Sequence, residues 1–122
     1  MADAPNVLYV KHLALAQCSD LSDVERADVF RAWPGRDREN QPVLVFIPAH
    51  LRKAELEQAF LLFIRDADAI AHSPYRIVLV NSNSAVGLRL AISAARRARS
   101  VLPRRYRKNL EAVSVVHPSI FL

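Results

Sequence analysis

Residues 102–122 read LPRRYRKNLEAVSVVHPSIFL, and this stretch decides the fold. Its run of small and β-branched residues at 112–116 lies between a polar pair at 108–109 and the dipeptide His117-Pro118. A continuous apolar run of this kind is typical of a strand covered on both faces, as in a parallel sheet. Pro118 has no backbone N–H and restricts His117 to extended conformations, so we expect the strand to end there.

Two more apolar runs, at residues 43–47 and 77–80, have the same continuous character and predict strands covered on both faces. Helical periodicity fills residues 51–70 between them, and a second helical pattern at 86–102 leads to the last strand. Strands that alternate with helices predict a parallel sheet built from right-handed βαβ units. The fold class is therefore α/β.

A turn-rich segment separates residues 29–33 from the strand at 43–47 and predicts an antiparallel hairpin. Asp37 is suited to open the turn, and Asn40 tolerates a left-handed backbone better than most residues. Trp33 is expected at a strand end.

The N-terminal part predicts helices that pack against the sheet. Residues 1–19 form a helical arm with a helix at 7–16 after a loose end, and residues 20–122 form the domain proper. Ser22 and Glu25 match a capping box, which predicts a second, short helix.

Basic residues are concentrated in the C-terminal third. Residues 1–76 hold nine Lys/Arg against eleven Asp/Glu, whereas residues 77–122 hold eight against Glu111 alone. On a helical wheel, several of these arginines share one face. The candidate anionic-surface contacts are Arg89, Arg96, Arg97, Arg99, Arg104, Arg105, Arg107 and Lys108. A cationic face of this kind attracts phosphate groups, or it only keeps an alanine-rich helix hydrated.

Length and cysteine content limit the class of protein. A chain of 122 residues forms one domain that buries roughly two-thirds of its unfolded surface. A lone Cys18 excludes an intrachain disulfide, and no apolar run resembles a signal peptide or membrane span. We expect a cytoplasmic protein that is at most peripheral to membranes.

Residues for catalysis are sparse. The loop at 81–84 (NSNS) follows a predicted parallel strand, where α/β sheets place ligands, but helix capping explains it equally well. The histidines lie at His12, His50, His72 and His117, and no pair has metal-ligand spacing. With no nucleophile–base pair and no phosphate loop, we expect no enzyme activity, no metal and no cofactor. Aromatic residues are not interleaved with the arginines apart from Tyr106, so we expect no nucleic-acid binding.

Five blocks of the sequence resemble a known family. They are residues 20–23 (DLSD), 35–48 (GRDRENQPVLVFIP), 60–64 (FLLFI), 73–80 (SPYRIVLV) and 102–121 (LPRRYRKNLEAVSVVHPSIF). Together they resemble the divergent branch of the CRAL-TRIO lipid-binding domain. The blocks are similar to the module that follows the macro domain in ganglioside-induced differentiation-associated proteins, and to the related BCH domain of some Rho GTPase-activating proteins.

The resemblance implies a partial CRAL-TRIO-like three-layer fold. The family domain continues past the HP motif, so residues 20–122 are expected to be an incomplete domain. It also implies a non-enzymatic module for a lipid or another small hydrophobic ligand, or alternatively a scaffold that binds small GTPases or itself. The candidate hydrophobic contacts are Val45, Ile47, Phe60, Phe63, Val78 and Val80.

Overall fold

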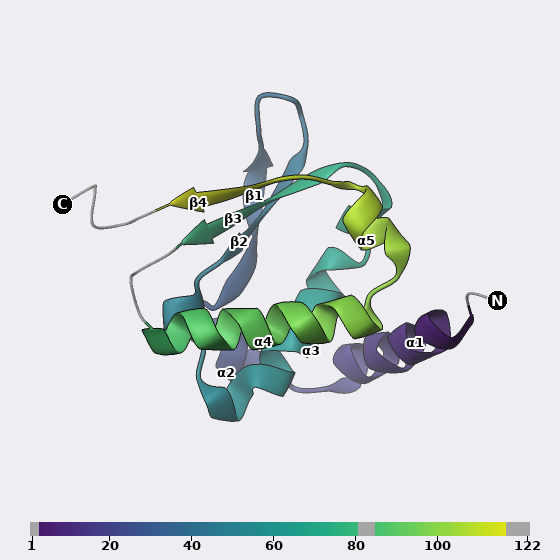
Figure 1. Ribbon diagram of the computed structural model, residues 1–122, viewed down its shortest axis with the longest axis vertical. Helices are drawn as coiled ribbons and strands as arrows, with labels where there is room; N and C mark the ends of the chain where they lie inside the picture. The colour runs from purple at the N-terminus through teal and green to yellow at the C-terminus, as the bar shows by residue number, and fades with distance from the viewer. Residues whose placement is uncertain (1–2, 81–84, 117–122) are drawn as a thin grey trace.

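The computed structural model describes residues 3–80 and 85–116, and Figure 1 shows a twisted sheet with the long helices gathered against one face. The helices are α1 (Asp3–Cys18), α2 (Ser22–Ala27), α3 (Leu56–Ala67), α4 (Ala85–Val101) and α5 (Arg104–Lys108), and the single-turn 3₁₀ helices are η1 (Pro48–His50), η2 (Lys53–Glu55) and η3 (Ile70–His72). The strands are β1 (Phe30–Arg36), β2 (Pro42–Phe46), β3 (Tyr75–Val80) and β4 (Leu110–Val116).

The four strands lie in the order β1-β2-β3-β4. The first pair is antiparallel, and the β2–β3 and β3–β4 pairs are parallel. The parallel pairs are connected through α3 and α4, and right-handed crossovers that progress in one direction place both helices on the same face. The predicted βαβαβ core with its antiparallel partner strand is confirmed.

The register of the sheet decides which side chains share a face, because they alternate along each strand. Phe46 pairs with Leu79, and both point to the helical layer. Val45 pairs with Val78 on the opposite face, which Val80 shares. Among the described residues, no helix packs on this second face (Figure 1).

The expectation that the last strand is covered on both faces is wrong. Strand β4 lies at the edge of the sheet, and Val113 and Val115 are 51% and 53% exposed. An edge strand has a neighbouring strand on one side only, so its apolar composition does not by itself bury it.

Strand β1 forms the other edge and includes Pro34. Trp33, predicted at a strand end, lies inside β1 and is 54% exposed. The pairing with β2 is irregular between Ala32 and Arg36. Proline is tolerated at an edge strand and at an irregularity because no ladder hydrogen bond is lost there.

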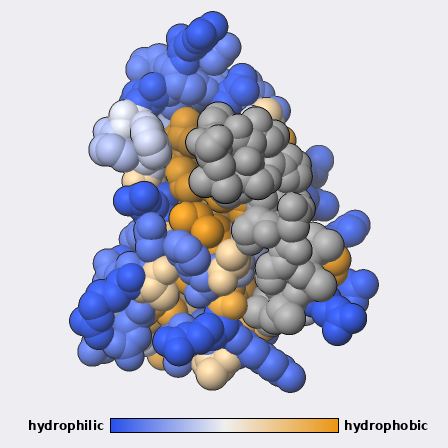
Figure 2. All heavy atoms as spheres, turned by 90° about the vertical axis from the view of Figure 1, so that its left-hand side faces the viewer, coloured by the Kyte–Doolittle hydropathy of each residue, from blue (hydrophilic) through white to orange (hydrophobic). Residues whose placement is uncertain are grey.

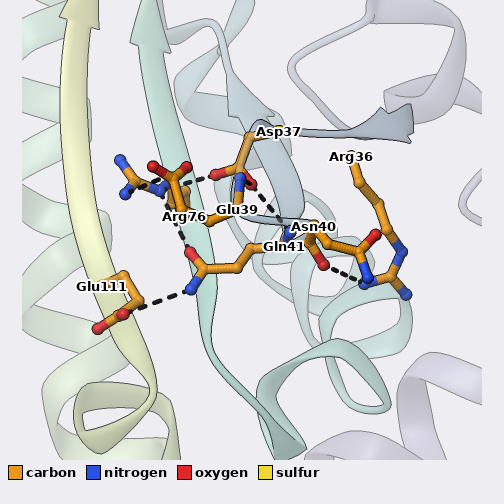
Figure 3. A network of polar contacts seen from close by, with 7 residues as sticks. All are labelled: Arg36, Asp37, Glu39, Asn40, Gln41, Arg76 and Glu111. Atoms are coloured by element: carbon orange, nitrogen blue, oxygen red, sulfur yellow. Dashed lines mark hydrogen bonds and ion pairs between the residues drawn. The ribbon is translucent and has the colours of Figure 1, made fainter.

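The hairpin turn is built as predicted. Asn40 has φ 60°, and its N–H donates to the carbonyl of Asp37 at 3.0 Å. The Asp37 carboxylate accepts the backbone N–H groups of Glu39 (3.0 Å) and Gln41 (2.9 Å) and lies 2.8 Å from Nε of Arg76 (Figure 3). One carboxylate therefore fixes the turn and joins it to β3.

Helix α1 is packed into the core. It begins at Asp3, where a loose end was expected, and Tyr9 and Ala16 are 4% and 1% exposed. Both belong to the same buried cluster as Leu62 and Ile64 of α3. The N-terminal arm is thus part of the helical layer.

Helix α2 confirms the predicted second helix, but its cap is different. Leu21 occupies the N-cap position without a side-chain hydrogen bond, so the predicted capping box is wrong. The backbone N–H and hydroxyl of Ser22 instead donate to Asp20, at 3.1 and 2.7 Å. Ser22 therefore makes its local side-chain hydrogen bonds with the carboxylate of Asp20 and not with that of Glu25.

Candidate functional site

A cavity of about 270 Å³ lies between the sheet and helices α3 and α4. All of its lining residues are apolar: Val29, Phe30, Phe46, Leu51, Leu56, Ala59, Phe60, Phe63, Ile77, Leu79, Ala94, Ala95, Ala98 and Val113. Figure 2 is viewed from the side at which β3 and β4 end, and it shows apolar atoms in a hollow strip between the hairpin and the helices.

Small side chains on α4 explain the cavity. Apart from Ala59, the strands and α3 contribute larger residues, such as Phe46 and Phe60, whereas α4 contributes Ala94, Ala95 and Ala98. An alanine methyl group is too short to reach the sheet, so volume remains where a larger residue would pack.

The predicted hydrophobic contacts are divided between two places. Phe60 and Phe63 line the cavity. Val45, Val78 and Val80 lie on the opposite face of the sheet, and Ile47 follows the end of β2. The structure therefore does not bring these six residues together.

Sequence reasoning missed Phe46, Ile77 and Leu79, which line the cavity from β2 and β3. Strands β2 and β3 are continuously apolar, so their hydrophobicity does not alternate with a period of two. An error of one residue in assigning the inward-facing positions therefore exchanges the two faces of the strand. The phenylalanine within the run of residues 43–47 was a usable signal, because large aromatic side chains dominate cores.

Arg97 holds the helices at one wall of the cavity. Its guanidinium lies 5.2 Å from the ring centroid of Phe60, which lines the cavity. It also pairs with Glu57 of α3 and lies 3.2 Å from Nε2 of His12 of α1. Arg97, predicted to contact an anionic surface, is therefore engaged by partners within the chain.

The remaining predicted cations form two groups. Arg89, Arg96 and Arg99 are exposed on α4. Arg104, Arg105, Arg107 and Lys108 lie on α5, and together they line an open hollow. We call these four residues the α5 cation cluster.

Arg105 is the anchored member of the α5 cation cluster. Its Nη2 donates to Oδ1 of Asp68 at 2.6 Å, and its guanidinium lies 5.2 Å from the ring centroids of both Tyr9 and Tyr106. The hydroxyl of Tyr9 also donates to Asp68, at 2.5 Å. Aromatic rings and a carboxylate thus fix one cation beside three exposed ones.

The tyrosines near α5 are held protonated. Burial raises the pKa of Tyr75 to about 12, and its hydroxyl donates to the carbonyl of Tyr106 at 2.6 Å. Burial is also the largest cause that raises the pKa of Tyr9, followed by its hydrogen bond to Asp68. The Tyr75 hydroxyl is therefore a donor that joins β3 to α5, and the Tyr9 hydroxyl is a donor that joins α1 to Asp68 after α3.

Among the described residues, the lining of the cavity has no ionisable side chain, so these walls supply hydrophobic contact. Within residues 3–80 and 85–116, no group of three His, Cys, Asp or Glu residues is arranged to hold a metal ion. The loop at 81–84 and His117 lie outside the described residues. None of the described helices is long and apolar enough to cross a membrane.

Comparisons with known proteins agree with this architecture. Residues 40–122 match the family described as "Divergent CRAL/TRIO domain". The chain is 32% identical over 117 residues to "Protein GDAP2 homolog" of Drosophila melanogaster and 26% identical over 116 residues to the protein of that name in Nematostella vectensis. It is also 26% identical over 116 residues to "Rho GTPase-activating protein gacY" of Dictyostelium discoideum.

Each of these matches covers 93% of this chain but only 21%, 23% and 16% of the respective relative. The chain thus spans about a fifth of the length of these proteins, so the similarity concerns one domain of each. The family match covers well over half of the chain and includes β2, α3, β3, α4, α5 and β4. The chain belongs to the divergent CRAL/TRIO domain family.

Proposed function

We propose that this domain binds a lipid or another small hydrophobic molecule without transforming it. The observation that carries the proposal is the cavity of about 270 Å³, lined entirely by apolar side chains. Ligand pockets are mostly apolar and span about 300–1,000 Å³, so this cavity lies just below that range. It suits one apolar part of a ligand, such as a hydrocarbon tail, whose polar end stays outside.

Membership of the CRAL/TRIO family supports the same function, because the family is associated with binding lipids and small hydrophobic ligands. The exposed cations on α4 and α5 provide a basic face for anionic head groups. In this account the protein is cytoplasmic and reaches membranes only peripherally.

The proposal is tested by extraction of the purified domain with organic solvent, followed by mass spectrometry. A hydrophobic compound should be recovered in near-stoichiometric amount, or be taken up when the protein is incubated with a lipid mixture. Absence of a compound in both experiments would contradict the proposal.

A signalling scaffold is the second candidate function. It is favoured by the edge strand β4, on which Val113 and Val115 are more than half exposed. Unpaired edges of this kind accept strands from other chains. One relative is named a Rho GTPase-activating protein, which makes a small GTPase, or a second copy of this domain, the partner to test first.

A further inference from the structure

The α5 cation cluster is concentrated on one short helix. Tyr106 is 2% exposed and points inward, and the other four residues of this five-residue helix line one hollow. Arg104, Arg107 and Lys108 are exposed, whereas Arg105 is partly buried beneath them. In the described part of the chain, these four cations are the residues that line the hollow.

Arg105 gives the cluster a fixed element. Asp68 and the rings of Tyr9 and Tyr106 hold its guanidinium in place. Its Nε is buried and has no hydrogen-bond acceptor among the described residues. A pre-positioned guanidinium loses less conformational freedom when an anion binds than a mobile surface side chain does.

The charge balance of the cluster indicates which anion fits. In the described part of the chain, Asp68 is the one carboxylate that forms an ion pair with the α5 cation cluster. Four positive charges and one negative charge leave a local excess of three. A carboxylate or phosphodiester offers one negative charge, whereas a phosphomonoester offers about 1.5 to 2 together with three acceptor oxygens.

We propose that the α5 cation cluster binds phosphomonoester groups, with Arg104, Arg107 and Lys108 as exposed contacts and Arg105 as the fixed guanidinium beside them. This inference rests on the proposed function, because it specifies which part of the basic face recognises which head group. The group comes either from a lipid such as phosphatidic acid or from a free phosphate compound. Nucleobases have no exposed ring on which to stack here, since Tyr9 and Tyr106 are both buried.

Two triple variants with equal loss of charge test the site. The first is Arg104→Gln/Arg107→Gln/Lys108→Gln on α5, and the control is Arg89→Gln/Arg96→Gln/Arg99→Gln on α4. All six side chains are exposed, so neither variant removes a buried contact. Circular dichroism confirms that both remain folded.

Binding is measured to phosphatidylcholine vesicles that contain either phosphatidic acid or phosphatidylserine at equal mole fraction, and to free pyrophosphate by calorimetry. The native chain should prefer phosphatidic acid, and the α5 variant should lose on the order of 100-fold in vesicle affinity, since each cation near an anionic surface contributes about fivefold. The α4 control should lose clearly less, because it weakens only the general attraction of the basic face to the vesicle and leaves the α5 cation cluster intact. Pyrophosphate binding that depends on α5 identifies a free anion as a sufficient ligand, whereas vesicle binding alone identifies the lipid head group.

Equal losses in both triple variants, or equal binding to both lipids, would overturn the proposal and leave a general cationic surface. Tighter binding of a single-stranded oligonucleotide than of either phosphate probe would also overturn it. The cavity is a separate element of the fold, so the α5 variant should still take up a hydrophobic ligand. Absence of hydrophobic-ligand uptake by the native chain would instead refute the proposed function.

Discussion

Arg105 of α5 and Asp68, the residue that follows α3, form an ion pair with Nη2 and Oδ1 2.6 Å apart. Both side chains are less than a third exposed, and Tyr9 of α1 shares the same carboxylate. Removing the charge of Asp68 leaves a partly buried guanidinium without its partner. Asp68→Asn should therefore lower the free energy of unfolding by roughly 1 to 3 kcal/mol, measured by urea denaturation.

The matched control is Asp23→Asn, which breaks the exposed ion pair between Asp23 and Arg26. An exposed pair contributes about 0 to 1 kcal/mol, so this variant should unfold close to the native midpoint. Equal destabilisation by the two variants would contradict a special role for Asp68.

Tyr75 makes stability depend on alkaline pH. Its pKa is raised to about 12 in the folded protein, so the protonated form is favoured in the folded state. The stabilisation that comes from the protonated Tyr75 hydroxyl is fully present below pH 10, which is the pKa of tyrosine in the unfolded chain. It is lost as the pH rises through 12. Urea denaturation should show a decrease between pH 10 and 12 that is smaller by about 2 kcal/mol in Tyr75→Phe, where the raised pKa values of Tyr9 and Tyr106 still contribute the rest. The same decrease in both proteins would assign it to other groups.

Asp37 is the side chain on which the hairpin turn depends (Figure 3). Asp37→Ala removes two hydrogen bonds to backbone N–H groups and the contact with Arg76. We expect a loss of about 2 kcal/mol in the free energy of unfolding. Glu39→Ala is the control, because its carboxylate is exposed and lies 3.8 Å from Arg76. Thermal unfolding should therefore show a lowered midpoint for Asp37→Ala and a midpoint close to that of the native chain for Glu39→Ala.

The edge strand β4 predicts self-association. Val115 is 53% exposed, and a charge at an edge blocks pairing with another strand. Sedimentation velocity at increasing concentration should show association of the native chain and its reduction in Val115→Lys. Val10→Lys, at an exposed position of α1, should leave association unchanged. A native chain that stays monomeric at high concentration would remove the support for the scaffold function.

Order and direction of the strands could be predicted from the sequence, because alternation of strand and helix and right-handed crossovers leave few topologies. The left-handed Asn40 and its partner Asp37 could also be predicted, since their chemistry is local. The exposure of β4 could not be predicted, because an apolar run of sequence does not show how many neighbouring strands it has.

The cavity was only partly predictable for a related reason. Phe60 and Phe63 stand out as large residues on a helix, but continuous apolar strands hide which face carries Phe46 and Leu79. Arg97 and Arg105 were expected at the surface with the other arginines. Their partners Glu57 and Asp68 are distant in sequence and become neighbours only in the folded chain.

The central claim is that a hydrophobic ligand occupies the cavity between the sheet and α4. Titration with an apolar fluorescent probe tests it most directly when the native chain is compared with Ala98→Phe, which fills the cavity, and Ser93→Phe, which adds the same ring at an exposed position of α4. Ala94→Leu provides a second, smaller obstruction if Ala98→Phe does not fold, as judged by circular dichroism.

The native chain and Ser93→Phe should bind the probe saturably with one site. Ala98→Phe should bind at least roughly tenfold more weakly, because the new ring occupies the volume that the probe needs. Equal affinity of the three folded proteins, or binding that does not saturate, would contradict the cavity as the ligand site.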